Sequence, residues 1–242
     1  MEVVREEFRP DPDLSRAEME ALQREIAREA LFEDEPLPES PVVVGVDQAF
    51  PGERAVSAIV AVRDGEVIER ASAVTALSIP YIPGLLSFRE GESILAAFEN
   101  LTCEPDLALF DGSGRIHFRQ AGLATHMGVA LDLPSVGVAK RLLCGRPSNP
   151  PEEPFAEGTR VPILADGRVE AEDGTVIGYA VQTRQYDGGS RYINPLYVSP
   201  GHRVGTETAA SLAVAHCTGY KLPEPIRLAD AYAGELSDEA RR

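Results

Sequence analysis

The feature that most constrains the fold is an almost entirely apolar segment, Val42–Phe50, interrupted only by Asp47 and the glutamine after it. A run this apolar is typical of a strand buried on both faces of a sheet. Two further strands are expected at Ala55–Arg63 and Glu66–Val74, because Asp64-Gly65 between them strongly favours a two-residue hairpin turn. The sequence therefore predicts a central strand followed at once by an antiparallel pair.

Downstream of this start, segments with helical periodicity alternate with short apolar runs. Such an order predicts a mixed α/β sheet with helices on both faces. This is the layout of the ribonuclease H-like fold, although other mixed α/β folds share it. A proline-rich loop is expected at residues 147–154. The expected helices are Glu90–Leu101, Gln120–Leu131, Thr206–Cys217 and Arg227–Leu236, and the expected strands are Leu107–Phe110, Ser135–Ala139, Val176–Thr183 and Leu196–Ser199.

Residues 1–40 form an acidic segment, with 13 acidic residues against five arginines. Ser15 followed by Glu18 is the pattern of a helix capping box, and Leu22 and Ile26 recur at helical spacing. We expect an amphipathic helix that covers an edge of the core. Because 242 residues suit one α/β domain, we expect a single domain over residues 1–242 with this helical segment packed on it.

The chain is acidic overall, with 39 Asp and Glu against 23 Lys and Arg and a net charge of −16. That balance argues against binding to nucleic acid phosphates. Residues 110–147, however, hold two acidic and five basic residues. Only Lys140 and Lys221 are lysine, so 21 of the 23 basic residues are arginine. Acid excess with few lysines is expected of a protein kept soluble in high salt, where charges are screened within about 3 Å at 1 M.

The N-terminus and the cysteines bear on location. The start of the chain lacks a basic region followed by an apolar one, and no stretch reaches the roughly 18 apolar residues of a membrane span. Three widely spaced cysteines match neither a disulfide framework nor a zinc site. We therefore expect a cytoplasmic monomer with no membrane partner.

Two aspartates end apolar strands where a carboxylate is costly. Asp47 follows Val-Val-Val-Gly-Val, and Asp111 follows Leu-Ala-Leu-Phe. A buried carboxylate costs several kcal/mol unless it is paired or bound to a metal, and a divalent cation would relieve the repulsion between two of them. Mg²⁺ prefers one or two carboxylates together with waters and phosphate oxygens. The alternative is that each aspartate caps the turn that follows it.

Other polar residues admit both a structural and a functional interpretation. Glu90 is expected to open a helix, where its charge suits the helix dipole, and Asp230 to lie exposed on the closing helix. His117 is a candidate acid, base or phosphate contact, or a buried structural residue. Lys140, one of only two lysines in the chain, ends an apolar strand near the candidate metal-binding carboxylates, which favours a role at a water or phosphate.

Two loops have unusual composition. Pro80-Tyr81-Ile82-Pro83-Gly84 is stiff and apolar, and such a rigid segment is able to enter between stacked bases. The alternative is a buried loop that packs on the core, which the residues alone favour. Asp111-Gly112-Ser113-Gly114 is rich enough in glycine to bring backbone N–H groups to a phosphate or base.

Taken together, these segments resemble the endonuclease V family of deoxyinosine-specific DNA repair nucleases. The N-terminal helix with Leu22, Gln23 and Ile26 also looks like the opening of that family, so the resemblance covers residues 14–234. The matching stretches are Gly45-Val46-Asp47, Pro80–Glu90, Asp111–Gly128, Pro134–Gly145, Asn194–Arg203 and Gly219–Asp230.

The resemblance implies a ribonuclease H-like fold with a carboxylate cluster that binds Mg²⁺, or Mn²⁺ in its place. It assigns the metal-binding acidic triad to Asp47, Glu90 and Asp111, a fourth acidic catalytic position to Asp230, and the catalytic histidine and lysine to His117 and Lys140. The DNA wedge would be Pro80, Tyr81, Ile82 and Pro83. The base pocket would be lined by Gly84, Leu86, Gly112, Gly114 and Gly122.

The activity so implied is hydrolysis of the second phosphodiester bond 3′ to deoxyinosine, leaving 3′-hydroxyl and 5′-phosphate ends, with inosine in RNA a substrate of some members. Ser113 and Phe118 depart from the histidine and proline common in the family, which puts the pocket shape in question. Two alternatives remain open: a resolvase-type ribonuclease H-like nuclease, and a non-catalytic nucleic-acid-binding module.

Overall fold

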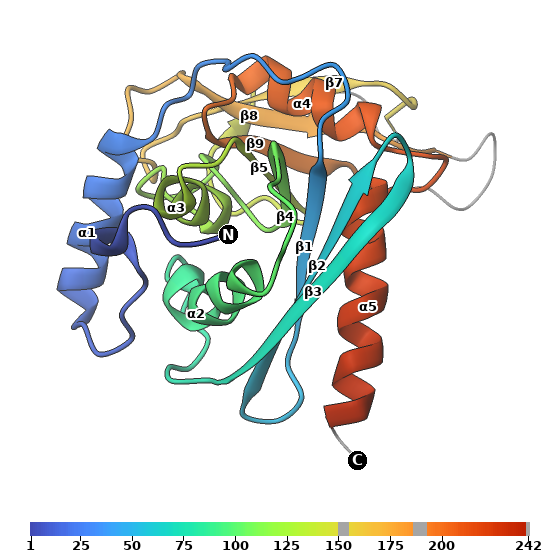
Figure 1. Cartoon of the computed structure of the whole chain (residues 1–242). Coiled ribbons are helices and arrows are strands. Elements are labelled where there is room, and N and C mark those ends of the chain that lie inside the picture. Colours follow the sequence, from blue (N-terminus) through green and yellow to red (C-terminus); the bar gives the residue numbers. More distant parts are fainter. Residues whose placement is uncertain (150–154, 186–192, 241–242) are drawn as a thin grey trace.

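A nine-stranded mixed sheet forms the centre of the molecule in the computed structural model, which describes residues 1–149, 155–185 and 193–240 (Figure 1). Within these residues the strand order is β3-β2-β1-β4-β5-β9-β8-β7-β6. The strands are β1 (Val43–Ala49), β2 (Arg54–Arg63), β3 (Glu66–Ala76), β4 (Leu107–Asp111), β5 (Ser135–Ala139), β6 (Arg146–Pro147), β7 (Arg160–Leu164), β8 (Val176–Val181) and β9 (Leu196–His202).

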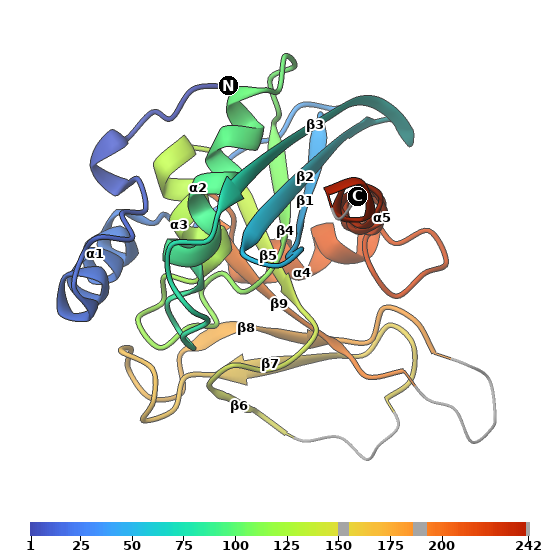
Figure 2. The same cartoon turned by 90° about the horizontal axis from the view of Figure 1, so that it is seen from below.

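Helices cover both faces of this sheet (Figure 2). On one face lie α2 (Leu86–Glu99) and α3 (Leu123–Leu131), and on the other lie α4 (Thr206–Ala215) and α5 (Glu224–Ala240). The predicted mixed α/β fold with helices on both faces is confirmed. None of the helices in the described part of the chain has both the length and the apolar character needed to cross a bilayer.

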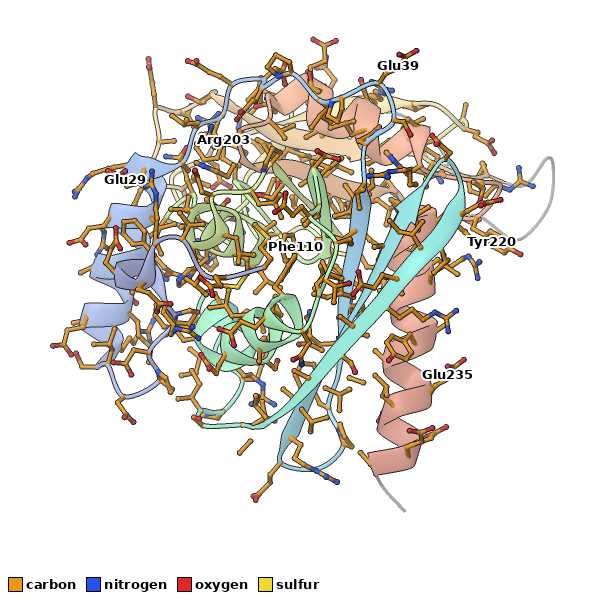
Figure 3. The ribbon with its side chains drawn as sticks, viewed as in Figure 1. Glu29, Glu39, Phe110, Arg203, Tyr220 and Glu235 are labelled. Carbon is orange, nitrogen blue, oxygen red and sulfur yellow. The ribbon has the colours of Figure 1, made fainter. Side chains whose placement is uncertain are left out.

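The two cores arise from the alternation of side chains along the central strands. Val44 of β1 and Phe110 of β4 point to the α2 and α3 side, whereas Val43 and Leu109 point to the α4 and α5 side. Figure 3 shows Phe110 in the interior, while acidic residues such as Glu235 point outward. Leu109 and Phe110 point to opposite faces and are both fully buried, so β4 must be apolar on both faces.

The direction of the central strands determines where a site is built. The predicted hairpin β2–β3 is antiparallel, but β1 runs parallel to β4 and β4 runs parallel to β5. The carboxyl ends of these three strands therefore meet at one edge of the sheet. Ligands in open α/β sheets bind preferentially at that edge.

The N-terminal segment forms the predicted cover. After the short 3₁₀ helix η1 (Glu6–Phe8), helix α1 (Arg16–Glu29) begins with the expected capping box. The Ser15 side chain accepts from the Glu18 backbone N–H, and the Glu18 carboxylate accepts from the Ser15 N–H. Ile26 is fully buried against Val129 and Ala130 of α3.

Several element boundaries differ from the prediction. Helix α2 begins at Leu86 rather than at Glu90, so Glu90 lies in the second turn and is buried, and the dipole explanation for it is wrong. Its N-cap, Leu85, makes no side-chain capping bond, which leaves no sequence signal for the true start. Strand β7 was not predicted, because Pro162 lacks an N–H and weakens a strand pattern. The proposed loop at 147–154 lies mostly outside the described residues.

Candidate active site

Two predicted carboxylates and the predicted lysine lie at the carboxyl ends of the three parallel strands. Val46 of β1 pairs with Phe110 of β4, so the same register places Asp47 beside Asp111. Because side chains alternate along a strand, Asp47 lies on the same face as Val43, the face that α5 covers. Lys140 directly follows β5, the strand next to Asp111.

Helix α5 approaches β1 closely and brings a fourth group. A Cβ at Gly45 would lie 2.0 Å from the Pro225 carbonyl carbon, so only glycine permits this approach. Asp230, farther along α5, lies close enough to the Asp47 side chain to raise its pKa. Asp230 is exposed, as the sequence predicted, and nevertheless reaches the end of β1.

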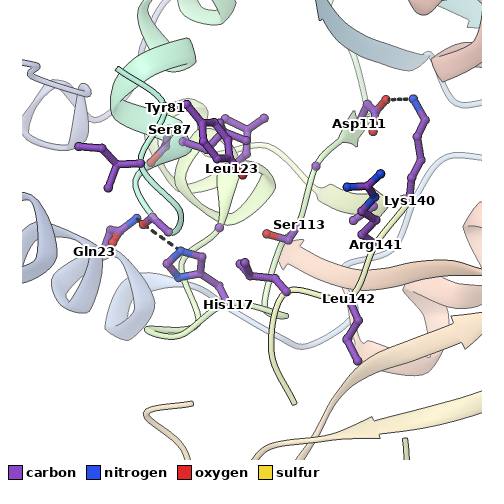
Figure 4. Close-up of a pocket in the computed structure, with 17 residues that line it drawn as sticks. Gln23, Tyr81, Ser87, Asp111, Ser113, His117, Leu123, Lys140, Arg141 and Leu142 are labelled. Carbon is purple, nitrogen blue, oxygen red and sulfur yellow. Dashed lines mark hydrogen bonds and ion pairs between the residues drawn. The ribbon is translucent and has the colours of Figure 1, made fainter. Parts of the chain in front are cut away.

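Lys140 is held among the acids. Its Nζ donates to Asp111 Oδ2 at 2.6 Å (Figure 4). Burial lowers the pKa of Lys140, but the hydrogen bond and charge of Asp111, with smaller contributions from Asp47 and Asp230, more than offset it and raise the pKa. The lysine therefore carries its full charge at the end of the parallel strands.

The two buried carboxyl groups are held protonated near neutral pH. Burial raises the pKa of Asp47 to about 8, and the charge of Asp111 and the interaction of the protonated Asp47 carboxyl, as donor, with Asp230 add to the rise. Burial also raises the pKa of Glu90 to about 8, with a further contribution from Asp111. Asp111 thus interacts with both groups, although Glu90 comes from α2 on the other face of the sheet.

The donor set suits a hard divalent cation in kind, since it consists of carboxylate oxygens. In the described ranges, no three His, Cys, Asp or Glu side chains gather closely enough to hold a metal ion by themselves. Mg²⁺ does not require such a cage, because it is usually bound by one or two carboxylates with waters and substrate phosphates. Burial forces Asp47 and Glu90 to take up a proton near neutral pH, at a cost in free energy. A bound cation would stabilise their charged forms and remove that cost.

A cavity of about 440 Å³ lies beside this group. Figure 4 shows Tyr81, Gln23 and His117 on one side of it and Asp111, Lys140 and Arg141 on the other. It brings together predicted catalytic, wedge and pocket residues. Gly114 is not among its described lining residues and packs against Pro200 instead. The lining includes Tyr81, Ile82, Gly84, Leu86, Gly112, Ser113, His117, Gly122, Asp111 and Lys140.

The proline-flanked loop at the rim projects into solvent. Tyr81 is 66% exposed, so the interpretation of this segment as a buried loop is wrong. The loop is fixed at its base, because Ile82 packs against Met19 and Leu85 and Arg89 donates to the Ile79 carbonyl at 2.7 Å. An exposed aromatic ring on an anchored loop is suited to contact a flat partner such as a base.

His117 is buried, and both of its ring nitrogens are engaged. Nε2 lies 3.0 Å from the Gly84 carbonyl oxygen, which only accepts, so Nε2 carries the proton. Nδ1 then accepts from the Arg119 backbone N–H at 3.2 Å. Burial lowers the pKa of His117 to about 3, and the imidazole is therefore neutral.

The sequence assigned no role in the site to one buried polar residue at this cavity, Gln23. Gln23 is 1% exposed and lies on the apolar face of α1 between Met19 and Ile26. A polar residue inside an apolar helical stripe was the available signal. Its Nε2 donates to the Gly84 carbonyl at 3.0 Å, and its Oε1 accepts from Arg119 Nε at 2.7 Å.

The sequence matches one family over most of its length. A family model described as Endonuclease V matches residues 20–231. An Endonuclease V of Haloarcula marismortui is 59% identical over 260 residues, which cover 96% of this chain and 96% of the relative.

Solved structures agree in fold. The Endonuclease V of Streptomyces avermitilis has a TM-score of 0.81 at 33% identity and covers 100% of both chains. The Endonuclease V of Ciona intestinalis, solved in complex with a 24mer DNA containing an inosine followed by a ribo-adenosine, has a TM-score of 0.75 at 27% identity and covers 93% of this chain and 98% of its own. With sequence and fold in agreement, this chain belongs to the endonuclease V family of nucleases, which act on phosphodiester bonds.

Proposed function

We propose that this chain hydrolyses the second phosphodiester bond 3′ to deoxyinosine in DNA and leaves 3′-hydroxyl and 5′-phosphate ends, as a step in DNA repair. The observation that carries the proposal is the cavity in which Tyr81, Asp111 and Lys140 meet. The inosine-containing DNA bound by the Ciona intestinalis relative supports the choice of lesion. Inosine in RNA is a second candidate substrate for the same cavity.

Asp47, Asp111 and Glu90 would hold the cation, with Asp230 beside Asp47. The proposed ion is Mg²⁺, with Mn²⁺ as a substitute, because the donors are hard oxygens. When bound, such a cation activates water and stabilises charge on the leaving 3′-oxygen. The proximity of Asp111 to both buried carboxyl groups supports this ligand set.

The side chains of the protein supply position and charge. Lys140, 2.6 Å from Asp111, places a positive charge where the scissile phosphate would lie. A fixed charge of this kind stabilises the extra negative charge of the transition state without reorganisation. His117 is neutral and donates to the Gly84 carbonyl, so we assign it to shaping the cavity.

The cavity and the exposed Tyr81 would act on the base. Tyr81 would enter the stack beside the lesion, and hypoxanthine would leave the helix for the cavity lined by Gly84, Gly112 and Gly122. Inosine pairs weakly, which lowers the cost of extruding it. Gly114 would support this wall from behind, since a Cβ there would lie 2.3 Å from the Pro200 oxygen.

The test is a nicking assay on a labelled duplex with a single deoxyinosine, with Mg²⁺, in low and in molar salt. We expect one nick, one nucleotide beyond the lesion, that Asp47→Asn abolishes and the exposed-site control Asp13→Asn retains. Equal nicking by Asp47→Asn, or no nick at either salt, contradicts the proposal. Lesion-independent cutting of a four-way junction would favour a resolvase. Binding of DNA without any cutting would favour a non-catalytic module.

We infer a single domain over residues 1–242, active as a cytoplasmic monomer adapted to salt. An excess of 39 acids over 23 basic residues, with 21 arginines among the latter, supports the salt adaptation. Light scattering in molar KCl tests the monomer, and loss of folded protein below about 0.1 M salt tests the adaptation.

A further inference from the structure

The Gly84 carbonyl is a point of convergence between the N-terminal helix and the cavity. Gly84 follows the loop that carries Tyr81 and has a left-handed φ of +82°. Its oxygen lies within hydrogen-bond distance of Gln23 Nε2 at 3.0 Å, His117 Nε2 at 3.0 Å and an Arg119 terminal nitrogen at 3.2 Å. A carbonyl oxygen has two lone pairs, so these three donors use its full capacity to accept hydrogen bonds.

These donors also bind one another. Arg119 Nε donates to Gln23 Oε1 at 2.7 Å, which fixes the orientation of the amide so that its NH₂ points at Gly84. The same NH₂ group lies 3.3 Å from the Ala121 carbonyl. The Arg119 backbone N–H donates to His117 Nδ1. In Figure 4 the side chains of Gln23 and His117 point toward each other at the cavity wall.

We propose that Gln23, oriented by Arg119, is a positioning residue that fixes the Tyr81 loop and the adjoining cavity wall through the Gly84 carbonyl. The exposed Tyr81 ring makes few contacts of its own, so its direction depends on the loop ends at Ile82 and Gly84. Helix α1 is thereby a part of the lesion-recognition apparatus in addition to covering the core. This inference rests on the proposed function for its enzymatic consequence.

A loop released at Gly84 has more conformations to lose when it enters DNA. This loss of conformational entropy opposes entry into duplex DNA, where the strands must be separated. It matters less on single-stranded DNA. Gln23→Met keeps the length of the side chain and removes its hydrogen bonds to Gly84, Ala121 and Arg119. We expect about a tenfold loss in single-turnover cleavage of duplex, the size of one hydrogen bond, with less than about a threefold loss on single strands.

The matched control introduces the same residue on the exposed face of the same helix, as Glu25→Met. It should leave the duplex-to-single-strand ratio of cleavage rates unchanged. A 2-aminopurine beside the deoxyinosine adds a direct readout, since its fluorescence rises when the wild-type protein unstacks it. We expect that rise to be reduced in Gln23→Met. A merely structural role for Gln23 would lower both cleavage rates in proportion and leave their ratio intact.

Hydrogen exchange of the DNA-free protein tests positioning without any cleavage. We expect faster exchange for the amides of Ile82 and of residues 84–86 in Gln23→Met than in wild type or Glu25→Met. The inference is overturned if this segment exchanges equally fast in Gln23→Met and in wild type. It is also overturned if wild type nicks deoxyinosine but Gln23→Met leaves the duplex-to-single-strand ratio of cleavage rates unchanged. A wild-type protein that fails to nick, yet shows the exchange difference, overturns the proposed function alone.

Discussion

Replacing Glu90 with glutamine is expected to stabilise the protein in the absence of metal near neutral pH. Burial raises the pKa of this carboxyl from an ordinary value of 4.5 to about 8. Between these two values the folded state binds a proton that the unfolded chain does not. The free energy of unfolding therefore decreases as the pH rises through this window, because the folded state holds more protons.

The size of the effect follows from the distance between the pH and the ordinary pKa. The ordinary pKa of this carboxyl is 4.5, and pH 7 lies 2.5 units above it. At pH 7 the folded protein nevertheless keeps the carboxyl protonated. At 1.36 kcal/mol per unit, this costs about 3 kcal/mol. At pH 5 the same arithmetic leaves less than about 1 kcal/mol. Glutamine keeps the shape of the protonated group and carries no such cost.

The measurement is urea unfolding in molar KCl with a chelator, at pH 5, 6, 7 and 8. Glu90→Gln should exceed wild type by about 3 kcal/mol at pH 7, or roughly 6–12 °C in Tm, and match it at pH 5. Glu92→Gln, exposed on the same helix, is the control and should change stability by less than about 1 kcal/mol. A difference between Glu90→Gln and wild type that is the same at all four pH values would refute the reasoning.

Further predictions concern the cation, the lysine, the wedge and the fold. Mg²⁺ should raise the Tm of wild type at pH 7 more than that of Glu90→Gln, as calorimetry will show, because bound ligand stabilises only the state that holds it. Lys140→Gln should lower single-turnover nicking about 100-fold, since it removes the charge beside Asp111, with binding to uncleaved DNA as the comparison. Tyr81→Ala should reduce nicking of duplex more than of single strands in the same assay. Ser15→Ala should lower the free energy of unfolding in urea by about 1 kcal/mol through loss of the cap.

The sheet and its acidic edge were predictable because their signals are local. The hairpin at Asp64-Gly65 and the capping box at Ser15 are short patterns with one physical meaning, and both were confirmed. Asp47 and Asp111 were recognisable because each ends an apolar run, and the register of β1 and β4 then places them side by side.

The features of the site that the sequence did not predict depend on contacts between segments that are distant in the chain. Glu90 was misplaced because α2 begins without a capping side chain, and its burial arises from tertiary packing. Asp230 reaches Asp47 only because Gly45 lets α5 approach β1. Gln23 needed the position of Gly84, 61 residues away, before its role in the cavity was visible. Periodicity along one helix contains none of this information.

The spatial distribution of charge reconciles an acidic protein with a nucleic acid substrate. Asp111 is the only acid among the described residues that line the cavity, where Lys140 and Arg141 also lie. On the outer surface, Arg9 bridges Glu6, Glu92 and Glu99, a geometry that the five donors of the planar guanidinium favour. At Asp111 the positive group contacts a single carboxylate instead of several. The compact ammonium of Lys140 lies 2.6 Å from one oxygen of Asp111. A planar guanidinium therefore suits several carboxylates at once, whereas a compact ammonium suits the single carboxylate oxygen at Asp111.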